Sequence, residues 1–426
     1  MDRPSLRPSA LRRGAARNLA LDLVVAVGVG VTLALVTTLL PTIGRRAGLE
    51  PIGLAALGAA PFVANLLGAF SGRFGPRSPL GLAVLRGLGA ASLVTVLIVP
   101  IAPVMIGAAF AFWVSLSFGS PFHLRLWGVM YPSSVRGRVV GVIGMGRAAA
   151  AALAALAGGL VADRLGGPSA VAIAGLVGIA CAVAYTGFRA AAAAEPPRFS
   201  ARDAVRAMRD RPVLGRLALA QGFYGGGLIA AAPLFALVFV DRLELSLAQV
   251  GVLGILGAGA TTLAFPLWGM VADRVGPLVG LRVGAALGVA GLVGYALAPD
   301  VAILWLAVVL AGVAGPATDV GIASVVSEQT TLASRAPAMA GWNAITGARG
   351  IVAAFAMSTL VQAGVVDVAT GLLLCAAASA VGLVLFVRTR PEVPVDSRAW
   401  ELAPVRPAPP VLAAAPPRRA SSAEPG

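Results

Sequence analysis

Residues 269–277 read Gly-Met-Val-Ala-Asp-Arg-Val-Gly-Pro and lie between two long apolar runs. Residues 68–76, which lie 201 positions earlier, read Gly-Ala-Phe-Ser-Gly-Arg-Phe-Gly-Pro and are also flanked by apolar runs. Four positions coincide at this offset: Gly68 with Gly269, Arg73 with Arg274, Gly75 with Gly276, and Pro76 with Pro277. A helix–turn–helix unit is therefore used once in each half, which predicts an internally duplicated membrane protein.

The composition excludes a soluble domain. Hydrophobic residues make up 58% of the chain and charged residues 12%, against about 45–50% and about 25% in soluble domains. Apolar stretches of about 20 residues recur, and each is long enough to cross a bilayer core as a helix. We predict twelve such spans, at 19–40, 51–71, 79–99, 102–124, 139–162, 168–187, 214–239, 247–271, 279–299, 301–325, 338–362 and 366–387.

The spans fall into two groups of six. We therefore expect an all-α integral membrane protein with twelve transmembrane helices in two pseudo-symmetric six-helix lobes. The predicted domains are a cytoplasmic arm at 1–18, a first lobe at 19–187, a cytoplasmic connector at 188–213, a second lobe at 214–387 and a disordered cytoplasmic tail at 388–426. Within the connector, Ser200 and Asp203 form a plausible capping pair for a short helix.

The arginines predict the orientation. With the N-terminus in the cytoplasm, 27 of the 33 basic residues, all of them Arg, lie on the cytoplasmic side and 4 on the other. That count includes Arg86, at the start of the third span. Such a bias follows the positive-inside rule. We expect a multi-pass protein of the cell's inner (cytoplasmic) membrane with both termini in the cytoplasm, and no cleavable signal.

Twelve helices as six plus six, with a Gly-x-x-x-Asp-Arg-x-Gly turn after the second helix of each half, resemble the major facilitator superfamily over residues 17–388. Residues 40–43, Leu-Pro-Thr-Ile, add to the resemblance. It implies a transporter that works by alternating access, with the turn as a gating motif. In that family the Asp and Arg of the turn hold neighbouring cytoplasmic helix ends together while the transporter faces outward.

Carried over onto this chain, the second copy matches the gating turn at Asp273, Arg274 and Gly276. The first copy matches at Arg73 and Gly75, but Gly72 stands at the Asp position, so that copy lacks the carboxylate.

Residues 159–166, Gly-Leu-Val-Ala-Asp-Arg-Leu-Gly, repeat the pattern after the fifth predicted helix, on the predicted outer side. The short turn is therefore only moderately specific. An ordinary surface turn pair is the alternative for Asp273 and Arg274.

Four ionisable residues fall inside or near the predicted spans, where a charge costs roughly 2.5–3.5 kcal/mol at the centre. They are Arg349, Arg147, Asp319 and Asp22. One interpretation is that they line a central cavity as a substrate or proton pathway, with Arg147 paired to Asp22 and Arg349 to Asp319 until substrate or protons compete. The other is that they form static salt bridges that lock helix packing.

Uncharged polar residues give weaker candidates. Gln221 and Tyr224 stand beside Gly225-Gly226-Gly227 in the seventh span and are candidates for the pathway. Asn65, Asn343 and Gln362 are more simply explained by interhelical hydrogen bonds. His123 is the only histidine, which excludes a multi-histidine metal site. We expect it at the membrane interface, with a proton relay as the alternative.

The sequence has no phosphate-cradling Gly-x-x-x-x-Gly-Lys, no cysteine or histidine cluster and no Ser-His-Asp set. We therefore predict no enzyme activity, catalytic residue, cofactor or metal. The predicted function is secondary active transport of a small molecule, with efflux slightly favoured over uptake and proton coupling as a hypothesis. The alternatives are an uptake carrier for organic anions or metabolites, and a non-transporting receptor or scaffold. We expect a monomer that contacts membrane lipids and no nucleic acid.

Overall fold

A computed structural model describes residues 13–131, 133–188 and 200–390. These ranges are almost entirely helical and contain no strand. The predicted all-α fold is confirmed, and each of the twelve predicted spans corresponds to a helical segment. The predicted tail beyond residue 390, residues 1–12 of the arm and residues 189–199 of the connector lie outside the described residues.

The first half contains six long helical segments. They are α1 (Arg13–Ala34) with the π-turn η2 (Leu35–Leu39) and α2 (Leu40–Arg46), α3 (Pro51–Leu67) with η3 (Gly68–Phe70) and α4 (Ser71–Phe74), α5 (Pro79–Ile98), α6 (Ala102–Met130), α7 (Ser133–Leu165), and α8 (Gly167–Ala182) with η4 (Val183–Gly187). The α-helical part of the second span ends at Leu67, earlier than predicted, because the chain tightens into a 3₁₀ turn before the gating motif.

The second half repeats this order. It contains α10 (Pro212–Leu237) with the π-turn η5 (Val238–Arg242), α11 (Leu247–Val275), α12 (Pro277–Leu297), α13 (Val301–Gln329), α14 (Leu332–Gln362) and α15 (Val368–Arg388). In the described ranges, eleven helical segments are long and apolar enough to cross a membrane, and the 17-residue α3 is shorter. The first helix of each half continues through a π-turn.

The connector helix α9 (Ala201–Arg209) begins where the sequence predicted. The Ser200 amide donates to the Asp203 carboxylate at 2.7 Å, and the Asp203 amide donates to the Ser200 hydroxyl at 3.3 Å. These reciprocal bonds form a capping box, which satisfies two amides that the first helical turn leaves without intrahelical partners.

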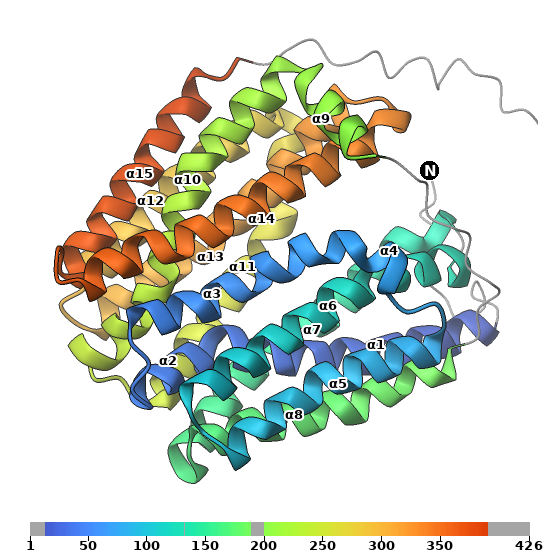
Figure 1. Ribbon diagram of the computed structural model, residues 1–426. Helices are drawn as coiled ribbons and strands as arrows, with labels where there is room; N and C mark the ends of the chain where they lie inside the picture. Colours follow the sequence, from blue (N-terminus) through green and yellow to red (C-terminus); the bar gives the residue numbers. More distant parts are fainter. Residues whose placement is uncertain (1–12, 132, 189–199, 391–426) are drawn as a thin grey trace, which may run out of the picture.

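The halves meet along two pairs of helices. α7 packs along α11, and α3 packs along α14 (Figure 1). The fifth and second spans of one half thus contact the second and fifth spans of the other, as expected for two copies of one bundle that face each other. Glycines allow close approach at the α7–α11 seam: a Cβ at Gly159 would lie 2.3 Å from the Leu247 carbonyl oxygen, and one at Gly251 would lie 2.5 Å from that of Ala155.

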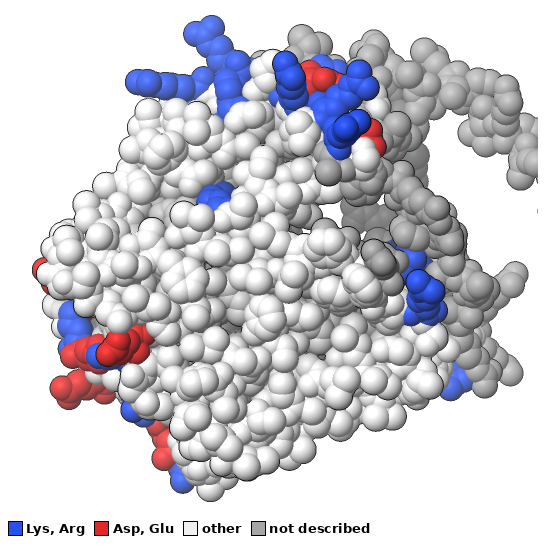
Figure 2. All heavy atoms as spheres, viewed as in Figure 1, with Lys and Arg blue, Asp and Glu red and all other residues white. Residues whose placement is uncertain are grey.

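The molecule has two charged ends. We call the end where α1 begins and α15 ends the terminal face, and the other end the opposite face (Figure 1). On the visible side, charged residues gather near these two ends, with a broad and almost uncharged band between them (Figure 2). A band of that kind is expected for a surface in contact with lipid tails.

Candidate functional site: the cavity between the halves

A cavity of about 670 Å³ lies between the two halves. Helices α1, α3, α6 and α7 of the first half line it together with α14 of the second. Its polar groups come from Asn65, Ser117, Ser120, Arg147 and Asn343. The Ser117 hydroxyl donates to the Asn65 side-chain oxygen at 2.9 Å, while the Arg147 side chain is exposed. The cavity therefore offers hydrogen-bonding groups and one accessible cation.

A second space of about 360 Å³ continues toward the opposite face and is also lined by both halves. Leu33 lines both spaces. The hydroxyl groups of Thr37, Thr38 and Thr42 are its main polar features in an otherwise largely apolar lining. The two spaces together trace a path along the interface of the halves.

A pocket of about 350 Å³ opens sideways from the cavity into the first half. Ser120 and Arg147 line both the pocket and the cavity. The other polar side chains of the pocket are those of Asp22, Arg86, His123, Trp127 and Tyr185. We call this space the arginine pocket.

Asp22 is completely buried at one wall of the arginine pocket. Its carboxylate interacts with His123 Nε2 at 2.8 Å, accepts from Trp127 Nε1 at 3.1 Å, and accepts from the Tyr131 hydroxyl at 2.6 Å. With Nε2–H of a neutral imidazole donating to Asp22, Nδ1 is the acceptor for the Tyr185 hydroxyl at 3.3 Å. The carboxylate is therefore held by partners within the first half.

The predicted pairing of Arg147 with Asp22 is wrong. Asp22 faces the end of α6, where His123 and Trp127 stand four residues apart on one side of the helix, with Tyr131 four residues further on. This spacing was readable in the sequence as a row of donors, but its carboxylate partner on another helix was not. His123 accordingly lies in a side-chain network with a buried carboxylate rather than simply at the interface.

Arg86 is also placed differently from the sequence prediction, which counted it among the cytoplasmic arginines. It is the eighth residue of α5, and its guanidinium reaches into the arginine pocket. Nη2 donates to the Ser120 hydroxyl at 3.3 Å, while Nε and Nη1 are buried without a hydrogen-bond partner in the described part of the chain. Gly119 leaves room for it, because a Cβ there would lie 3.0 Å from Nε.

Arg349 lies on α14, away from the arginine pocket. Its Nη1 donates to the backbone carbonyl of Gln221 on α10, its guanidinium lies against Gly225, and its aliphatic stem lies against Gly226. Tyr224 is buried and its hydroxyl reaches the Gly284 carbonyl at 3.5 Å. Gln221 is also buried, and its side-chain oxygen has no partner within the described ranges. These residues hold α10, α12 and α14 together.

The predicted pairing of Arg349 with Asp319 is also wrong. Arg45 pairs with Asp241 and His123 with Asp22 within 4.0 Å, and neither Arg349 nor Asp319 belongs to either pair. Asp319 is exposed on α13, whereas Arg349 donates to the Gln221 carbonyl on α10. Spacing along the sequence could not show which way each side chain turns.

The gating turn of the second copy is open to solvent at the terminal face. Asp273 and Arg274 are exposed and belong to neither ion pair. Gly276 has φ of 101°, a conformation that favours glycine. Gly75 has an ordinary φ, but a Cβ there would lie 2.3 Å from the Ser71 carbonyl oxygen. The side chain of Arg73 lies outside the described atoms.

The third copy of the turn has a definite role in the structure. Asp163 accepts hydrogen bonds from the backbone amides of Leu247 and Ala248, at 2.9 and 2.8 Å, and so caps α11 of the other half. At the same face the Arg45 guanidinium pairs with Asp241 at 2.9 Å, and Arg46 donates to the Leu245 carbonyl at 2.5 Å.

The amide nitrogen of Gln362 on α14 donates to Glu50 at 2.5 Å, and its oxygen accepts from the Ile52 amide at 2.9 Å. The opposite face is thus closed by side chains that cross between the halves.

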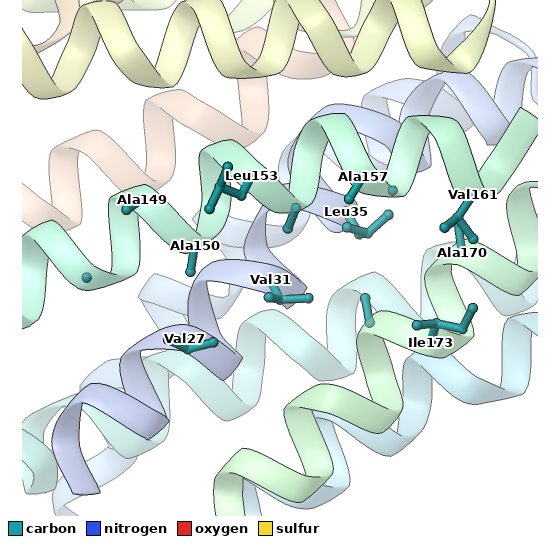
Figure 3. Close-up of a pocket in the computed structure, with 14 residues that line it drawn as sticks. Val27, Val31, Leu35, Ala149, Ala150, Leu153, Ala157, Val161, Ala170 and Ile173 are labelled. Carbon is teal, nitrogen blue, oxygen red and sulfur yellow. The ribbon is translucent and has the colours of Figure 1, made fainter. Parts of the chain in front are cut away.

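A further cavity of about 510 Å³ lies among α1, α7 and α8. Figure 3 shows Val27, Leu153 and Ile173 on its walls, and its whole lining is made of apolar residues and glycine. It offers no side chain that would fix a polar ligand, so it is a poor candidate for specific recognition.

The sequence matches the profile of the Major Facilitator Superfamily over residues 23–308 and 217–419. No curated protein matches it. The fold is similar to that of a bacterial homologue of the human lysosomal transporter Spinster in an inward-facing and occupied conformation, with a TM-score of 0.68, 14% identity, and coverage of 88% of this chain and 96% of that one.

The nucleoside transporter NupG is similar with a TM-score of 0.69, 14% identity, and coverage of 89% and 99%. The human organic anion transporter MFSD10 is similar with a TM-score of 0.61, 14% identity, and coverage of 88% and 100%. At these identities the likeness shows the fold alone. The family match covers most of the chain, however, and the chain therefore belongs to the Major Facilitator Superfamily, as a multi-pass membrane transporter rather than an enzyme.

Proposed function

We propose that this chain is a secondary active transporter that carries a small molecule through the cavity between its halves by alternating access. The observation that carries the proposal is an asymmetry. A cavity of about 670 Å³ lies between the halves on the terminal side, while polar side chains join the halves at the opposite face. A carrier that exposes its site to one side at a time requires one end closed while the other is accessible.

The orientation is part of the proposal. Arginines outnumber other charged residues at the terminal face of the visible side (Figure 2), which supports a cytoplasmic location for that face. The structure is then an inward-facing conformation in the cell's inner membrane, with both termini in the cytoplasm. In such a conformation the gating turn of the second copy is not expected to hold neighbouring helix ends together. The exposure of Asp273 and Arg274 agrees with this expectation.

The buried network around Asp22 supports the hypothesis of proton coupling. The Asp22 carboxylate and the His123 imidazole, two groups that can each carry a proton, lie 2.8 Å apart in a pocket that joins the cavity. Asp319, the other carboxylate invoked for coupling, is exposed on α13. Efflux remains slightly favoured over uptake, and we expect the protein to act as a monomer.

Alternating access is tested by locking the opposite face. Arg45→Cys and Asp241→Cys are introduced together after Cys181 and Cys375 have been replaced by alanine, and a metabolite and drug screen in a strain lacking the protein supplies a substrate. Oxidation should stop flux through proteoliposomes, and reduction should restore it. The single Arg45→Cys variant is the control, because it cannot form the cross-link. Flux that continues through the cross-linked protein would exclude alternating access at this interface.

Coupling and direction need separate measurements. Imposed pH gradients across proteoliposomes should change the initial flux if protons are coupled, and identical flux with and without the gradient would exclude coupling. Comparison of inside-out with right-side-out vesicles decides between efflux and uptake. A protein that binds a ligand but gives no flux in any of these assays would instead be a receptor or scaffold.

A further inference from the structure

The charges of the arginine pocket do not balance. Arg86 and Arg147 both line it, whereas Asp22 is its single carboxylate. Asp22 is already engaged by His123, Trp127 and Tyr131 and makes no ion pair with either arginine. The two arginines and the one carboxylate therefore leave at least one positive charge in excess in the pocket.

The donors of these arginines are available to a ligand. Nε and Nη1 of Arg86 are buried without a hydrogen-bond partner in the described ranges, although the Tyr185 hydroxyl lies close to the guanidinium. The Arg147 side chain is exposed and lines the pocket as well as the cavity. Ser120, which accepts from Arg86, also lies on the boundary of the two spaces. The unused donors thus lie where the pocket meets the proposed route.

We infer that the arginine pocket binds the anionic oxygen group of an organic substrate, a carboxylate or a similar oxyanion, between Arg86 and Arg147. This inference rests on the proposed transport function and names its substrate class. Guanidinium groups form strong charge-assisted hydrogen bonds with carboxylates and phosphates. A bound anion would neutralise the excess charge and occupy donors that otherwise stay unsatisfied inside the membrane.

The rest of the pocket indicates an apolar body for that substrate. Val25, Val29, Leu124, Val140 and Ile143 line it beside the charged groups. Its volume of about 350 Å³ lies within the range of small-molecule sites, which is about 300–1,000 Å³. An acid with a compact aromatic or aliphatic body matches both the walls and the charge.

Arg349 is not part of this site. Its guanidinium is held by the Gln221 carbonyl on α10, and it lines neither the arginine pocket nor the central cavity. Of the two arginines that the sequence analysis placed inside spans, Arg147 therefore belongs to this site and Arg349 does not. The second arginine of the site is Arg86, which also belongs to the first half.

The test is equilibrium binding to the purified full-length protein in nanodiscs of phosphatidylcholine. The probes are radiolabelled benzoate, 2-naphthoate and hexanoate, each paired with its uncharged amide. We expect at least one acid to bind more tightly than its amide. Arg86→Gln and Arg147→Gln should each weaken that binding by about tenfold or more, the usual effect of losing one charge-assisted hydrogen bond.

The control is Arg77→Gln, which removes an exposed arginine from the turn before α5 and should leave acid binding unchanged. Arg147→Gln alters an exposed side chain and so tests the site even if Arg86→Gln does not fold. Gly119→Ala adds a third measurement, since its Cβ would crowd Arg86 while preserving both charges. Equal binding of acids and amides, or wild-type affinity in both glutamine variants, would overturn the inference.

The same samples separate this inference from the proposed function. Acid binding that depends on Arg86 without any flux in proteoliposomes would refute transport and leave the anion site standing. Flux of a neutral substrate that persists in both glutamine variants would refute the anion site and leave the transport function standing. The last experiment uses nanodiscs that contain phosphatidylglycerol. If this lipid co-purifies with the protein only when Arg86 is present, and acid binding is lost, the site binds a lipid headgroup and the substrate assignment is overturned.

Discussion

The carboxylate of Asp163, at the end of α7, caps the other half of the molecule by accepting the backbone amide of Leu247 at 2.9 Å. The Ala248 amide adds a second bond at 2.8 Å. A carboxylate at a helix N-terminus is stabilised both by these amides and by the helix dipole. This contact joins the halves at the opposite face, so it should favour the conformation in which that face is closed.

Asp163→Asn should shift the conformational equilibrium toward opening at the opposite face. Asn keeps one of the two oxygens that accept the Leu247 and Ala248 amides, so the change removes one hydrogen bond, worth about 0.5–1.5 kcal/mol. That loss corresponds to a change of roughly 2-fold to 13-fold in the ratio of closed to open molecules. The measurement is the rate at which a membrane-impermeant maleimide labels Thr38→Cys in a background without Cys181 and Cys375. Asp300→Asn is the matched control, since Asp300 caps α13 from within its own half. Equal labelling rates in the two variants would contradict the role of Asp163.

Asp22→Asn should destabilise the first half. The amide keeps the size of the side chain but loses the charge that three donors share, and a hydrogen bond to a charged group contributes about 1.5–3 kcal/mol. Asp22→Ala should be worse, because His123, Trp127 and Tyr131 would all lose their acceptor. Thermal unfolding in detergent measures both. Asp203→Asn, at the exposed start of α9, controls for loss of a carboxylate. An unfolding temperature for Asp22→Ala equal to that of the control would show that the network does not stabilise the fold.

Gly276→Ala should weaken the turn between α11 and α12. The residue has φ of 101°, and a side chain in left-handed backbone costs about 1–2 kcal/mol. Gly269→Ala is the control, because a Cβ there would meet no atom within 4 Å and the residue is helical. Thermal unfolding should distinguish the two, with the larger loss at Gly276. If Gly269→Ala were the more harmful change, the backbone explanation would fail.

The capping box of α9 should respond to acid. Hydrogen bonds from Ser200 lower the pKa of Asp203 below its ordinary value. The stabilisation is therefore complete above the unfolded pKa of about 3.9 and is lost as the pH falls through the lower folded value. Hydrogen exchange of α9, compared with Asp203→Asn at each pH, should show a difference at neutral pH that disappears in strong acid. A difference that persisted at the lowest pH would contradict the assignment.

The fold was predictable because each membrane-spanning helix needs a run of about 20 apolar residues, which is easily recognised in the sequence. Predicted limits such as 79–99 and 301–325 lie close to α5 and to the start of α13, since apolar runs end where the lipid does. The first helix was predicted too short: it begins at Arg13 and continues to Arg46, because helical structure outside the lipid carries no apolar signal.

The candidate site was only partly predictable. Arg147 was found because a charge inside an apolar run is conspicuous, but Arg86 lies close enough to a helix start to resemble an interfacial anchor. The partners of Asp22 and Arg349 depend on how neighbouring helices are rotated, which a single sequence does not record. The third Gly-x-x-x-Asp-Arg-x-Gly turn was visible, but its contact with α11 depends on the docking of two halves.

The π-turns η2 and η5 set the rotational phase of the chain that follows them. Each inserts roughly one residue more than a regular helix would need, and one residue corresponds to about 100° of rotation. Arg45 is the sixth residue of α2, which follows η2 directly, and Asp241 lies within η5. The directions of both side chains in the pair at the opposite face therefore depend on these π-turns. Deletion of a single residue from Leu35–Leu39 would straighten the helix and swing Arg45 out of reach of Asp241, with no change in any side chain of the pair.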